Sequence, residues 1–576
     1  MRFTSLDRRD QLRQAVAQIL SSEHNGALTR AVETASVDFK EEAGRRNGPN
    51  LEPGNTENPE AATKLADEVA CMANSPGGGA LILGIEDSTG LILGTQLDTE
   101  WLRQRIYQAI DVAPAIEEHY VGGQRVLVLY VAESREPVTD THDRLRWRVG
   151  DSCRPVDRAE WWLHRERSHD HDSMADRSSL TAKDITPGAM RLVRDDLQAD
   201  TTETDTALLR RIAALRTDHH LSQAARLLLT PARETLIDLT VIDVAGGTVI
   251  NRVAPDPALS LREQIALIEQ SLATLNTYST QPSDRFALSP QRMIPSSAVR
   301  EAILNGIIHR DWNSSEPTEI RWIAMDSTLI VRSPGGFTGG IDATNVLSNR
   351  HARYPALADL FRALTLVEKQ GMGVDRMYNA MIPLGHRPPS IIEEAGPHVS
   401  CTLIGGEPIL PIAELFRLIR PVPRQRDYRV AIIVDMLLRE PFATTQAIAQ
   451  ALQMDIEGAG AALRATAQCT VHDSALIQSY QEAWILSDPA RHIAASAQKA
   501  PWFADVLSYT STTVETCGRV TQTWCHAFGQ ISTGELMRLT GASRGTAQRA
   551  LISLTDRGDL IRIGSGRSTA YRQPHP

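Results

Sequence analysis

The sequence predicts a multidomain protein of the α/β plus α+β class, in which two larger mixed units precede small helical units. Three observations support this fold class. The chain has 576 residues, enough for about three to five domains. Segments 27–162 and 291–405 each combine apolar strand-like runs with helical segments. Segments 426–490 and 500–574 contain short helical patterns, and the second ends in a strand-like pair.

The composition is that of a soluble globular protein, with 42% hydrophobic and 23% charged residues. The net charge is −10, so any contact with nucleic acid must use a local basic patch. No lysine follows a glycine, which excludes a P-loop ATPase. Without a signal-peptide core or an apolar run near 18 residues, we expect no membrane contact and a cytoplasmic location. Six cysteines, none in a C-x-x-C motif, fit a reducing compartment.

Elements of the first mixed unit follow in order. Residues 1–26 have the apolar spacing of an amphipathic helix. A second helix begins at Asn58, Pro59 and Glu60, which supply an N-cap, a first-turn proline and an acid, and it ends near Asn74. The apolar run 80–85 predicts a buried strand. We expect a hairpin of 124–131 with 144–149 to complete the sheet.

The middle of the chain is organised by changes in composition. Polar residues 163–188 predict a linker, and 189–290 predict a connecting α/β region with one strong strand at 236–244. The second mixed unit occupies 291–405. A proline-rich boundary separates it from the C-terminal units.

The first candidate site combines three carboxylates with a lysine. Asp38 and Lys40 are two residues apart in a strand, so their side chains share one face of the sheet. Glu33 precedes them, and Asp87 follows the strand at 80–85. If the two strands are neighbours, the three acids can hold Mg²⁺ or Mn²⁺, and Lys40 can pair with a phosphate. The alternative is a surface salt bridge between Asp38 and Lys40, with Asp87 as a turn residue.

A family resemblance adds to this hypothesis. The strings VETASVDFKEE, NSPGGGALILGIEDSTGLILG and RWRVG resemble the Schlafen AlbA_2 domain over about residues 25–160. In the nuclease branch of that family, three acids form a metal-dependent ribonuclease site for tRNA-like substrates. The resemblance assigns the metal to Glu33, Asp38 and Asp87, with Lys40 beside them. Asp38 departs from the family pattern, which usually has glutamate at this position.

The second candidate site lies on one helix. Glu301, Asn305 and His309 are four residues apart in a helix that starts near Pro295, so they share one stripe. Two strands, the turn SPGG at 333–336 and the segment EKQGMGV at 368–374 follow. The alternative to a ligand site is a hydrogen-bonded structural network or an interface.

This block resembles a divergent, GHKL-like ATP-binding domain that is often fused to AlbA_2. The resemblance implies that Glu301 orients water, Asn305 holds Mg²⁺, and Gly371 and Gly373 frame the phosphates of ATP. The adenine-reading aspartate of true GHKL sites is missing, because SPGG occupies its place. ATP hydrolysis is therefore not expected.

The last segment, 531–572, predicts a winged helix. Ser532 and Glu535 form a capping box, a turn follows at 540–542, and a second helix begins at Ser543. DNA-binding positions are predicted on that helix and on the wing: Arg544, Gln548, Arg549 and Arg567. The alternative is a winged helix used for protein contact or dimerisation. Residues 426–490 resemble a degenerate winged helix with weaker charge.

The overall pattern resembles bacterial proteins that join AlbA_2, a divergent ATPase and winged helices. Two functions follow as hypotheses. The preferred one is a divalent-metal-dependent endoribonuclease on tRNA-like RNA, acting as a defence effector, because acids fill all three metal positions. The alternative is a DNA-binding transcriptional regulator with a nucleotide-sensing central domain and no nuclease activity. We expect RNA or DNA as the partner, and a homo-oligomer.

Overall fold

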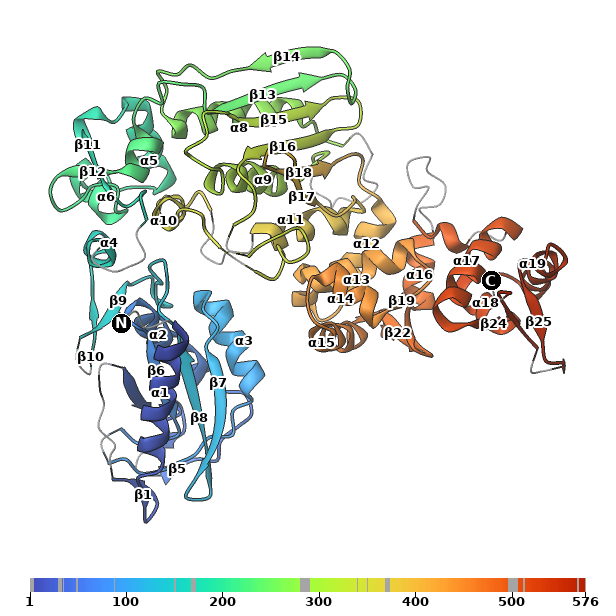
Figure 1. Ribbon diagram of the computed structural model, residues 1–576, viewed down its shortest axis with the longest axis horizontal. Coiled ribbons are helices and arrows are strands. Elements are labelled where there is room, and N and C mark those ends of the chain that lie inside the picture. Colours follow the sequence, from blue (N-terminus) through green and yellow to red (C-terminus); the bar gives the residue numbers. More distant parts are fainter. Residues whose placement is uncertain are drawn as a thin grey trace. The chain divides into compact units, whose positions relative to one another are not determined.

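The chain folds into two compact units in the computed structural model (Figure 1). The first comprises Met1–Glu234, Asp256–Gln264 and Tyr354–Met372, and the second comprises Thr235–Pro255, Ile265–Arg353 and Gly373–Pro576. The structure describes residues 5–29, 34, 36–47, 50–87, 89–149, 152–166, 172–279, 291–338, 340–349, 351–367, 373–495, 506–510, 513–566 and 569–574. Among the helices in these ranges, none is long and apolar enough to cross a membrane.

A four-stranded sheet forms the centre of the first unit. Its strands are β3 (Val37–Lys40), β6 (Gly79–Leu83), β8 (Gln124–Val131) and β7 (Ala115–Val121), in that spatial order. The pairing of β3 with β6 is parallel and the other two pairings are antiparallel. The two strands expected to carry the acid positions are therefore neighbours, with Asp38 opposite Leu81.

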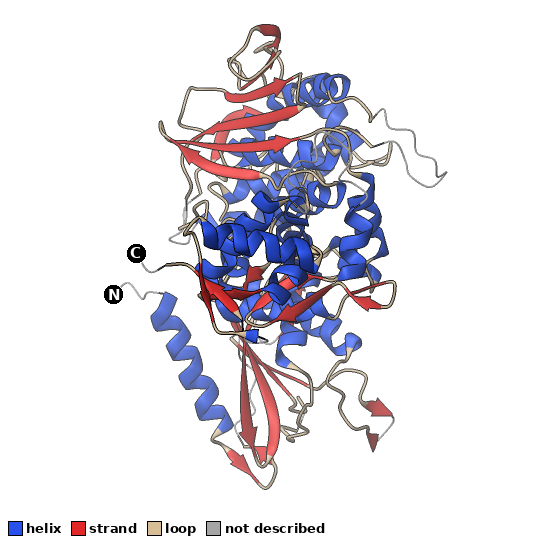
Figure 2. Cartoon of the chain, turned by 90° about the vertical axis from the view of Figure 1, so that its right-hand side faces the viewer, coloured by secondary structure: helices blue, strands red, loops and turns tan. Residues whose placement is uncertain are grey.

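Helices cover both faces of this sheet because its strands are apolar on both sides. On β6, Leu81 and Leu83 pack against α2 (Pro59–Asn74) and α3 (Thr99–Ile110). Ala80 and Ile82, on the opposite face, pack against α1 (Ser5–Leu20). This alternation follows the two-residue period of a strand. Figure 2 shows α1 running alongside the strands.

The expected start of α2 is confirmed, since the Asn58 side chain accepts a hydrogen bond from the Ala61 amide at 3.1 Å. The expected hairpin is wrong in its second strand. β8 pairs with β7 through a two-glycine turn, in which Gly122 and Gly123 have φ values of 56° and 80°. Residues 146–149 form β9 (Arg146–Val149), which pairs with β10 (Ser152–Pro155) instead. Strand β7 was not predicted from the sequence, because its residues are mostly half-buried and polar.

A smaller helical region completes the first unit. It contains α4 (Arg158–Glu166), β11 (Arg177–Thr181), η1 (Ala182–Asp184), α5 (Pro187–Asp196), α6 (Asp205–Arg211), β12 (His220–Ser222), α7 (Gln223–Leu229) and, from the second mixed segment, α10 (Pro355–Ala363). The stretch expected to be a linker therefore includes regular structure, because β11 pairs with β12, about 40 residues further along the chain. Minor two-stranded pairs are β1 (Glu23–His24) with β2 (Ala27–Leu28), and β4 (Arg46–Asn47) with β5 (Asn50–Leu51).

A six-stranded sheet begins the second unit. Its order is β14 (Val249–Val253), β13 (Ile237–Ile242), β15 (Thr318–Ile323), β16 (Thr328–Pro334), β18 (His398–Ile404) and β17 (Ser390–Glu394). β13 and β15 are parallel, so the strand expected in a separate connecting region belongs to this sheet. Helices of this segment are α8 (Leu261–Leu275), α9 (Ser296–Ile308) and α11 (Gly373–Met381), with η2 (Ile382–Leu384). α9 packs against β16, β18 and α11.

Two winged helices follow in the same unit, and each has the order helix, strand, helix, helix, strand, strand. The first consists of α13 (Tyr428–Arg439), β19 (Ala443–Thr444), α14 (Thr445–Leu452), α15 (Ile456–Ala467), β22 (Ile477–Tyr480) and β23 (Ala483–Leu486). The second consists of α17 (Val514–Phe528), β24 (Gln530–Ser532), α18 (Thr533–Thr540), α19 (Arg544–Asp556), β25 (Ile561–Ile563) and β26 (Ala570–Arg572). Accessory elements are α12 (Leu410–Leu418), η3 (Val422–Arg426), β20 (Thr470–Val471), β21 (Ser474–Ala475), α16 (Asp488–Ala495) and η6 (Ser508–Thr510).

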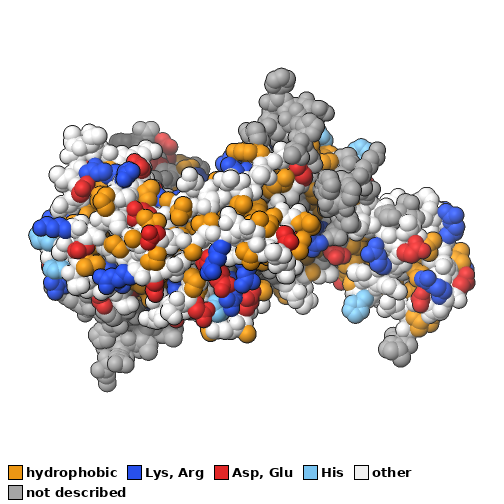
Figure 3. All heavy atoms as spheres, turned by 90° about the horizontal axis from the view of Figure 1, so that it is seen from above, with side chains coloured by type: hydrophobic (Ala, Val, Ile, Leu, Met, Phe, Trp, Pro, Cys, Tyr) orange, Lys and Arg blue, Asp and Glu red, His pale blue; other side chains and the backbone are white. Residues whose placement is uncertain are grey.

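The two winged helices share one hydrophobic core. The ring of Phe442, just after α13, lies 4.8 Å from that of Trp524 on α17, and Trp524 lies 4.4 Å from Phe528. Such ring distances are typical of packed aromatic clusters. On the face shown in Figure 3, acidic and basic side chains are interspersed. A nucleic-acid interface on that face would therefore be local, as the net charge predicts.

Candidate functional site

Asp38 is buried between two cations. Its side chain on β3 is 1% exposed, and Oδ2 lies 2.9 Å from Lys40 Nζ and 2.9 Å from the guanidinium of Arg148 on β9. Arg148 is equally buried, and its Nε donates to the carbonyl of Thr34. The salt bridge with Lys40 exists, but Asp38 lies in the interior and has a second partner that the strand pattern did not reveal.

Among the described residues, Asp87 does not form a group of metal-ligand side chains with Asp38. Asp87 is exposed in the turn after β6, and Glu33 lies outside the described residues. Two cations already neutralise the Asp38 carboxylate. A divalent ion prefers carboxylates that are free to coordinate it, so Asp38 in this arrangement does not fit the expected Mg²⁺ or Mn²⁺.

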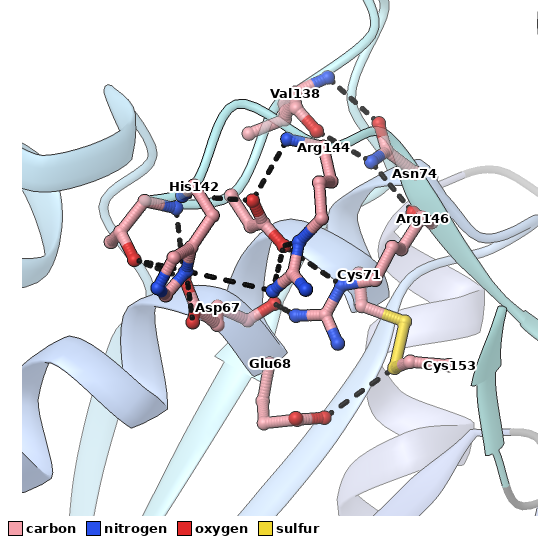
Figure 4. A network of polar contacts seen from close by, with 11 residues as sticks. Asp67, Glu68, Cys71, Asn74, Val138, His142, Arg144, Arg146 and Cys153 are labelled. Atoms are coloured by element: carbon pink, nitrogen blue, oxygen red, sulfur yellow. Dashed lines mark hydrogen bonds and ion pairs between the residues drawn. A yellow bond between two sulfur atoms is a disulfide. The ribbon is translucent and has the colours of Figure 1, made fainter. Parts of the chain in front are cut away.

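Within the described ranges, one group of three metal-ligand side chains does come together: Asp67, Asp140 and His142 (Figure 4). Asp140 Oδ2 lies 3.0 Å from both Arg144 and Arg146, and Oδ1 accepts from the amides of His142 and Arg144. Burial raises the pKa of Asp140, but these hydrogen bonds and cations outweigh it and lower the pKa overall. Arginine side chains and backbone amides already pair with both carboxylate oxygens of Asp140. The group therefore has a structural role, because it holds the turn before β9 in place.

A disulfide beside this network corrects the expectation of wholly reduced cysteines. Cys71 on α2 is bonded to Cys153 on β10, at a sequence separation of 82 and a Cα–Cα distance of 6.1 Å. The spacing carries no motif, so only the folded chain reveals the pair. Figure 4 shows Glu68 reaching toward it, with Oε2 at 3.4 Å from Cys153 Sγ.

Glu68 is a further acid of this region that the sequence analysis missed. Burial raises the pKa of its carboxyl, and the nearby positive charges of Lys40, Arg146 and Arg148 only partly offset that rise. The charge of Asp38 raises it further. Glu68 therefore belongs to the same electrostatic cluster as Asp38.

The helix expected to bind nucleotide places three of its four predicted residues together. Glu301 and Asn305 lie on α9, and a Cβ added to Gly373 at the start of α11 would lie 1.9 Å from Glu301 Oε1 and 3.1 Å from Asn305 Nδ2. Gly371 lies outside the described residues. Glycine allows this close approach of α11 to α9, because any larger side chain would overlap the Glu301 carboxylate. Arg376 on α11 forms an ion pair with Glu301, with 3.5 Å between Nη1 and Oε2.

The neighbours of this helix have structural roles. His309 is the C-cap residue of α9, and its carbonyl accepts a hydrogen bond from Arg353 Nε. Arg310 is buried and donates to the carbonyls of Leu236, Ser314 and Glu316. Burial beside Glu301 raises the pKa of the Cys401 thiol to about 12, so this thiol stays protonated.

The second winged helix presents a basic helix end. Arg544, Gln548 and Arg549 on α19 are all exposed, and Ser543 caps the helix by accepting from the Thr546 amide. Among the described residues neither arginine has an acidic partner. Arg567 lies outside the described residues. Exposed Arg562 and Arg572 on β25 and β26 add positive charge.

The first winged helix lacks this chemistry. Its helix α15 corresponds to α19, yet it begins with Ile456, which is 63% exposed, and Glu457. An exposed isoleucine followed by an acid does not suit a phosphate backbone. The weaker positive charge expected for the first winged helix is therefore found at the position where a recognition helix would contact DNA.

Comparisons with known proteins match each region to a family. Residues 33–157 match the Schlafen AlbA_2 domain, residues 318–403 match the family described as "Putative ATP-dependent DNA helicase recG C-terminal", and residues 410–495 match a family of unknown function. Residues 512–574 match the C-terminal domain of DIP2311-like transcriptional regulators. A search of curated proteins gave no match.

The fold and these matches define a class of multidomain proteins that join AlbA_2, an HATPase-like domain and a C-terminal regulator domain. The crystal structure of the DIP2311 protein from Corynebacterium diphtheriae is 51% identical, with a TM-score of 0.86, over 98% of this chain and 100% of that chain. The chain belongs to the DIP2311-like family. Its AlbA_2 and regulator domains support a nucleic-acid-related or regulatory role.

Proposed function

We propose that this chain is a DNA-binding transcriptional regulator whose second winged helix reads duplex DNA. The observation that carries the proposal is the exposed start of α19, where Arg544, Gln548 and Arg549 have no acidic partner in the described part of the chain. Arginine suits the acceptor edge of guanine, and glutamine suits adenine. The match of this domain to a transcriptional-regulator family supports the same function.

The docking geometry follows from the winged-helix fold. The N-terminal turn of α19 enters the major groove, where the two arginines and Gln548 face base edges. Arg562 and Arg572 on the adjacent strands contact phosphates, which carry no sequence information but set the register. The first winged helix, with Ile456 and Glu457 in the corresponding place, does not read DNA in this proposal.

The test is fluorescence anisotropy with a duplex selected from a random-sequence library. The doubly substituted protein Arg544→Ala/Arg549→Ala should lose sequence preference and bind the selected duplex more weakly, because the base-edge contacts of both arginines are removed. The matched control removes two exposed arginines from α3, as Arg103→Ala/Arg105→Ala. Duplex affinity that is equal in the α19 variant and the wild type would overturn the proposal.

The central domain has a sensing role in this proposal. If ATP binds, Asn305 is the residue that would hold the magnesium ion, and Gly373 is where the backbone would approach the phosphates. The nucleotide would contribute binding free energy rather than chemistry. Equilibrium binding of a fluorescent ATP analogue, compared between wild type and Asn305→Ala, tests this role. Equal binding by the two proteins would contradict it.

The endoribonuclease and defence-effector hypothesis stays a prediction, and the pairing of Asp38 with Lys40 and Arg148 does not favour it. Incubating labelled tRNA with and without Mn²⁺, with Asp87→Ala as the control, tests it directly. Metal-dependent cleavage that is lost in the variant would restore it.

A cytoplasmic location and a homo-oligomeric state accompany the regulator proposal. A transcriptional regulator must reach the chromosome. Two copies would place two copies of α19 on neighbouring half-sites of one duplex. Light scattering coupled to size-exclusion chromatography measures the mass in solution. A monomer both with and without DNA would contradict the oligomer.

A further inference from the structure

The disulfide between Cys71 and Cys153 is unequally covered. Cys71 is fully buried on α2, whereas Cys153 on β10 is half-buried and faces Glu68. The remaining cysteines are free: Cys401, Cys469, Cys517 and Cys525. The bond therefore has one sulfur that a reductant can approach, next to the electrostatic cluster that contains Asp38.

The disulfide fixes the strand pair that covers Asp38. Cys153 on β10 lies opposite Arg148 on β9, and Arg148 contributes the buried cation on Asp38. β9 has its own anchors on the end of α2, because Asn74 donates to the Arg146 carbonyl and Ser75 Oγ accepts from the Arg148 amide. The covalent bond from Cys153 adds a tie between β10 and α2.

We propose that Cys71 and Cys153 form a reversible redox pair, reduced by a dithiol, whose opening loosens β9 and β10 and exposes the carboxylates of Asp38 and Glu68. The proposal rests on the cytoplasmic location given under the proposed function, since disulfides in cytosolic proteins are usually transient or redox-sensing. The redox reaction itself is independent of DNA binding.

The reaction is a two-step thiol–disulfide exchange. A thiolate of the dithiol attacks Cys153 Sγ, the bond between Cys153 and Cys71 breaks, and Cys71 leaves as a thiolate that takes up a proton. The second thiolate of the dithiol then attacks the mixed disulfide and releases Cys153, which is also protonated. Two electrons and two protons pass to the protein, and the dithiol becomes a disulfide.

Glu68 sets the rate of the first step. In its ionised form the carboxylate lies 3.4 Å from the sulfur under attack and repels an approaching thiolate. The variant Glu68→Gln should therefore be reduced several-fold faster than the wild type at neutral pH. Glu100→Gln on α3, an exposed glutamate of the same unit, is the matched control and should react at the wild-type rate.

The test uses the full-length protein. Thiol titration in denaturant should give four thiols per chain before treatment with dithiothreitol and six after it. Hydrogen exchange followed by mass spectrometry should show at least tenfold faster exchange in peptides covering β9 and β10 after reduction. Peptides of α17 in the second unit should not change. Reoxidation should restore the slow exchange, which separates a switch from unfolding.

Two results would overturn the proposal. One is a disulfide that resists excess dithiothreitol for hours in the folded protein, which would make it a structural bond. The other is complete reduction with unchanged exchange in β9 and β10. The variant Cys71→Ser cannot form the disulfide, so its β9 and β10 peptides should exchange fast without reductant. The wild-type measurement tests the proposal even if this variant does not fold. Loss of DNA binding in the α19 variant bears on the regulator proposal alone.

Discussion

Breaking the buried ion pair of Arg148 and Asp38 should lower the free energy of unfolding. The burial of both side chains sets the size of the loss. Each side chain is 1% exposed, and their charged atoms are 2.9 Å apart. The variant Arg148→Ala leaves a buried carboxylate whose remaining cation, Lys40, has a 31% exposed side chain. Removing one partner of a buried pair costs about 3–5 kcal/mol of unfolding free energy.

An exposed pair in the same unit supplies the control. Arg103 and Glu100 on α3 are paired with side chains 49% and 69% exposed. Because water screens such a pair, Arg103→Ala should cost less than about 1 kcal/mol. The double variant Asp38→Asn/Arg148→Ala should be more stable than Arg148→Ala alone, since the unpaired buried charge is gone.

The assay is differential scanning calorimetry of the full-length oxidised protein. A cost of about 3–5 kcal/mol should lower the midpoint of the first unit by roughly 6–20 °C, and the transition of the second unit should stay in place. If Arg148→Ala and Arg103→Ala melt within about 2 °C of each other, the pair does not neutralise Asp38 as described. Failure of Asp38→Asn to recover stability would refute the same reasoning.

Three further predictions concern stability. Cys71→Ser should destabilise the first unit by about 4.5 kcal/mol in the chain-entropy treatment of an 82-residue loop, measured by calorimetry without reductant. Gly373→Ala should lower the midpoint of the second unit, because the added Cβ overlaps a buried carboxylate, at a cost of about 1–3 kcal/mol. Burial raises the pKa of Glu263, but hydrogen bonds from Thr186 and Ser260 outweigh it and hold the pKa below 4.5. Its stabilising contribution is therefore present above pH 4.5 and is lost as pH falls through the lower folded-state pKa; urea titrations should show a flatter acid limb for Glu263→Gln.

Local patterns predicted the elements that depend on neighbours in sequence. The N-cap of α2, the capping box of α18 and the turn at Gly541 that ends α18 all appear where the residues indicated them. Each depends on contacts within about four residues, so the sequence contains the whole interaction. The close approach of Gly373 to Glu301 and Asn305 is a contact between two helices that the sequence did not indicate.

Long-range contacts explain what the sequence could not provide. The spacing of Asp38 and Lys40 placed them on one face of a strand, but Arg148 comes from a strand 110 residues further along the chain. The Arg148 cation neutralises the Asp38 carboxylate. The residue that looked like a metal ligand in the sequence is therefore a buried, charge-paired group in the structure. The disulfide partner of Cys71 is similarly distant. Strand β7 was not predicted because most of its side chains are only half-buried, and its polar residues weaken the two-residue pattern.

The shared aromatic core of the winged helices limits how their function can be dissected. Phe442 of the first winged helix packs directly on Trp524 of the second winged helix. A chain truncated before α17 would leave Phe442 facing water and expose an apolar surface that favours aggregation. Loss of activity after such a deletion would then report misfolding of the first winged helix as much as loss of the second. Point substitutions on α19 separate these effects, because its arginines point away from that core.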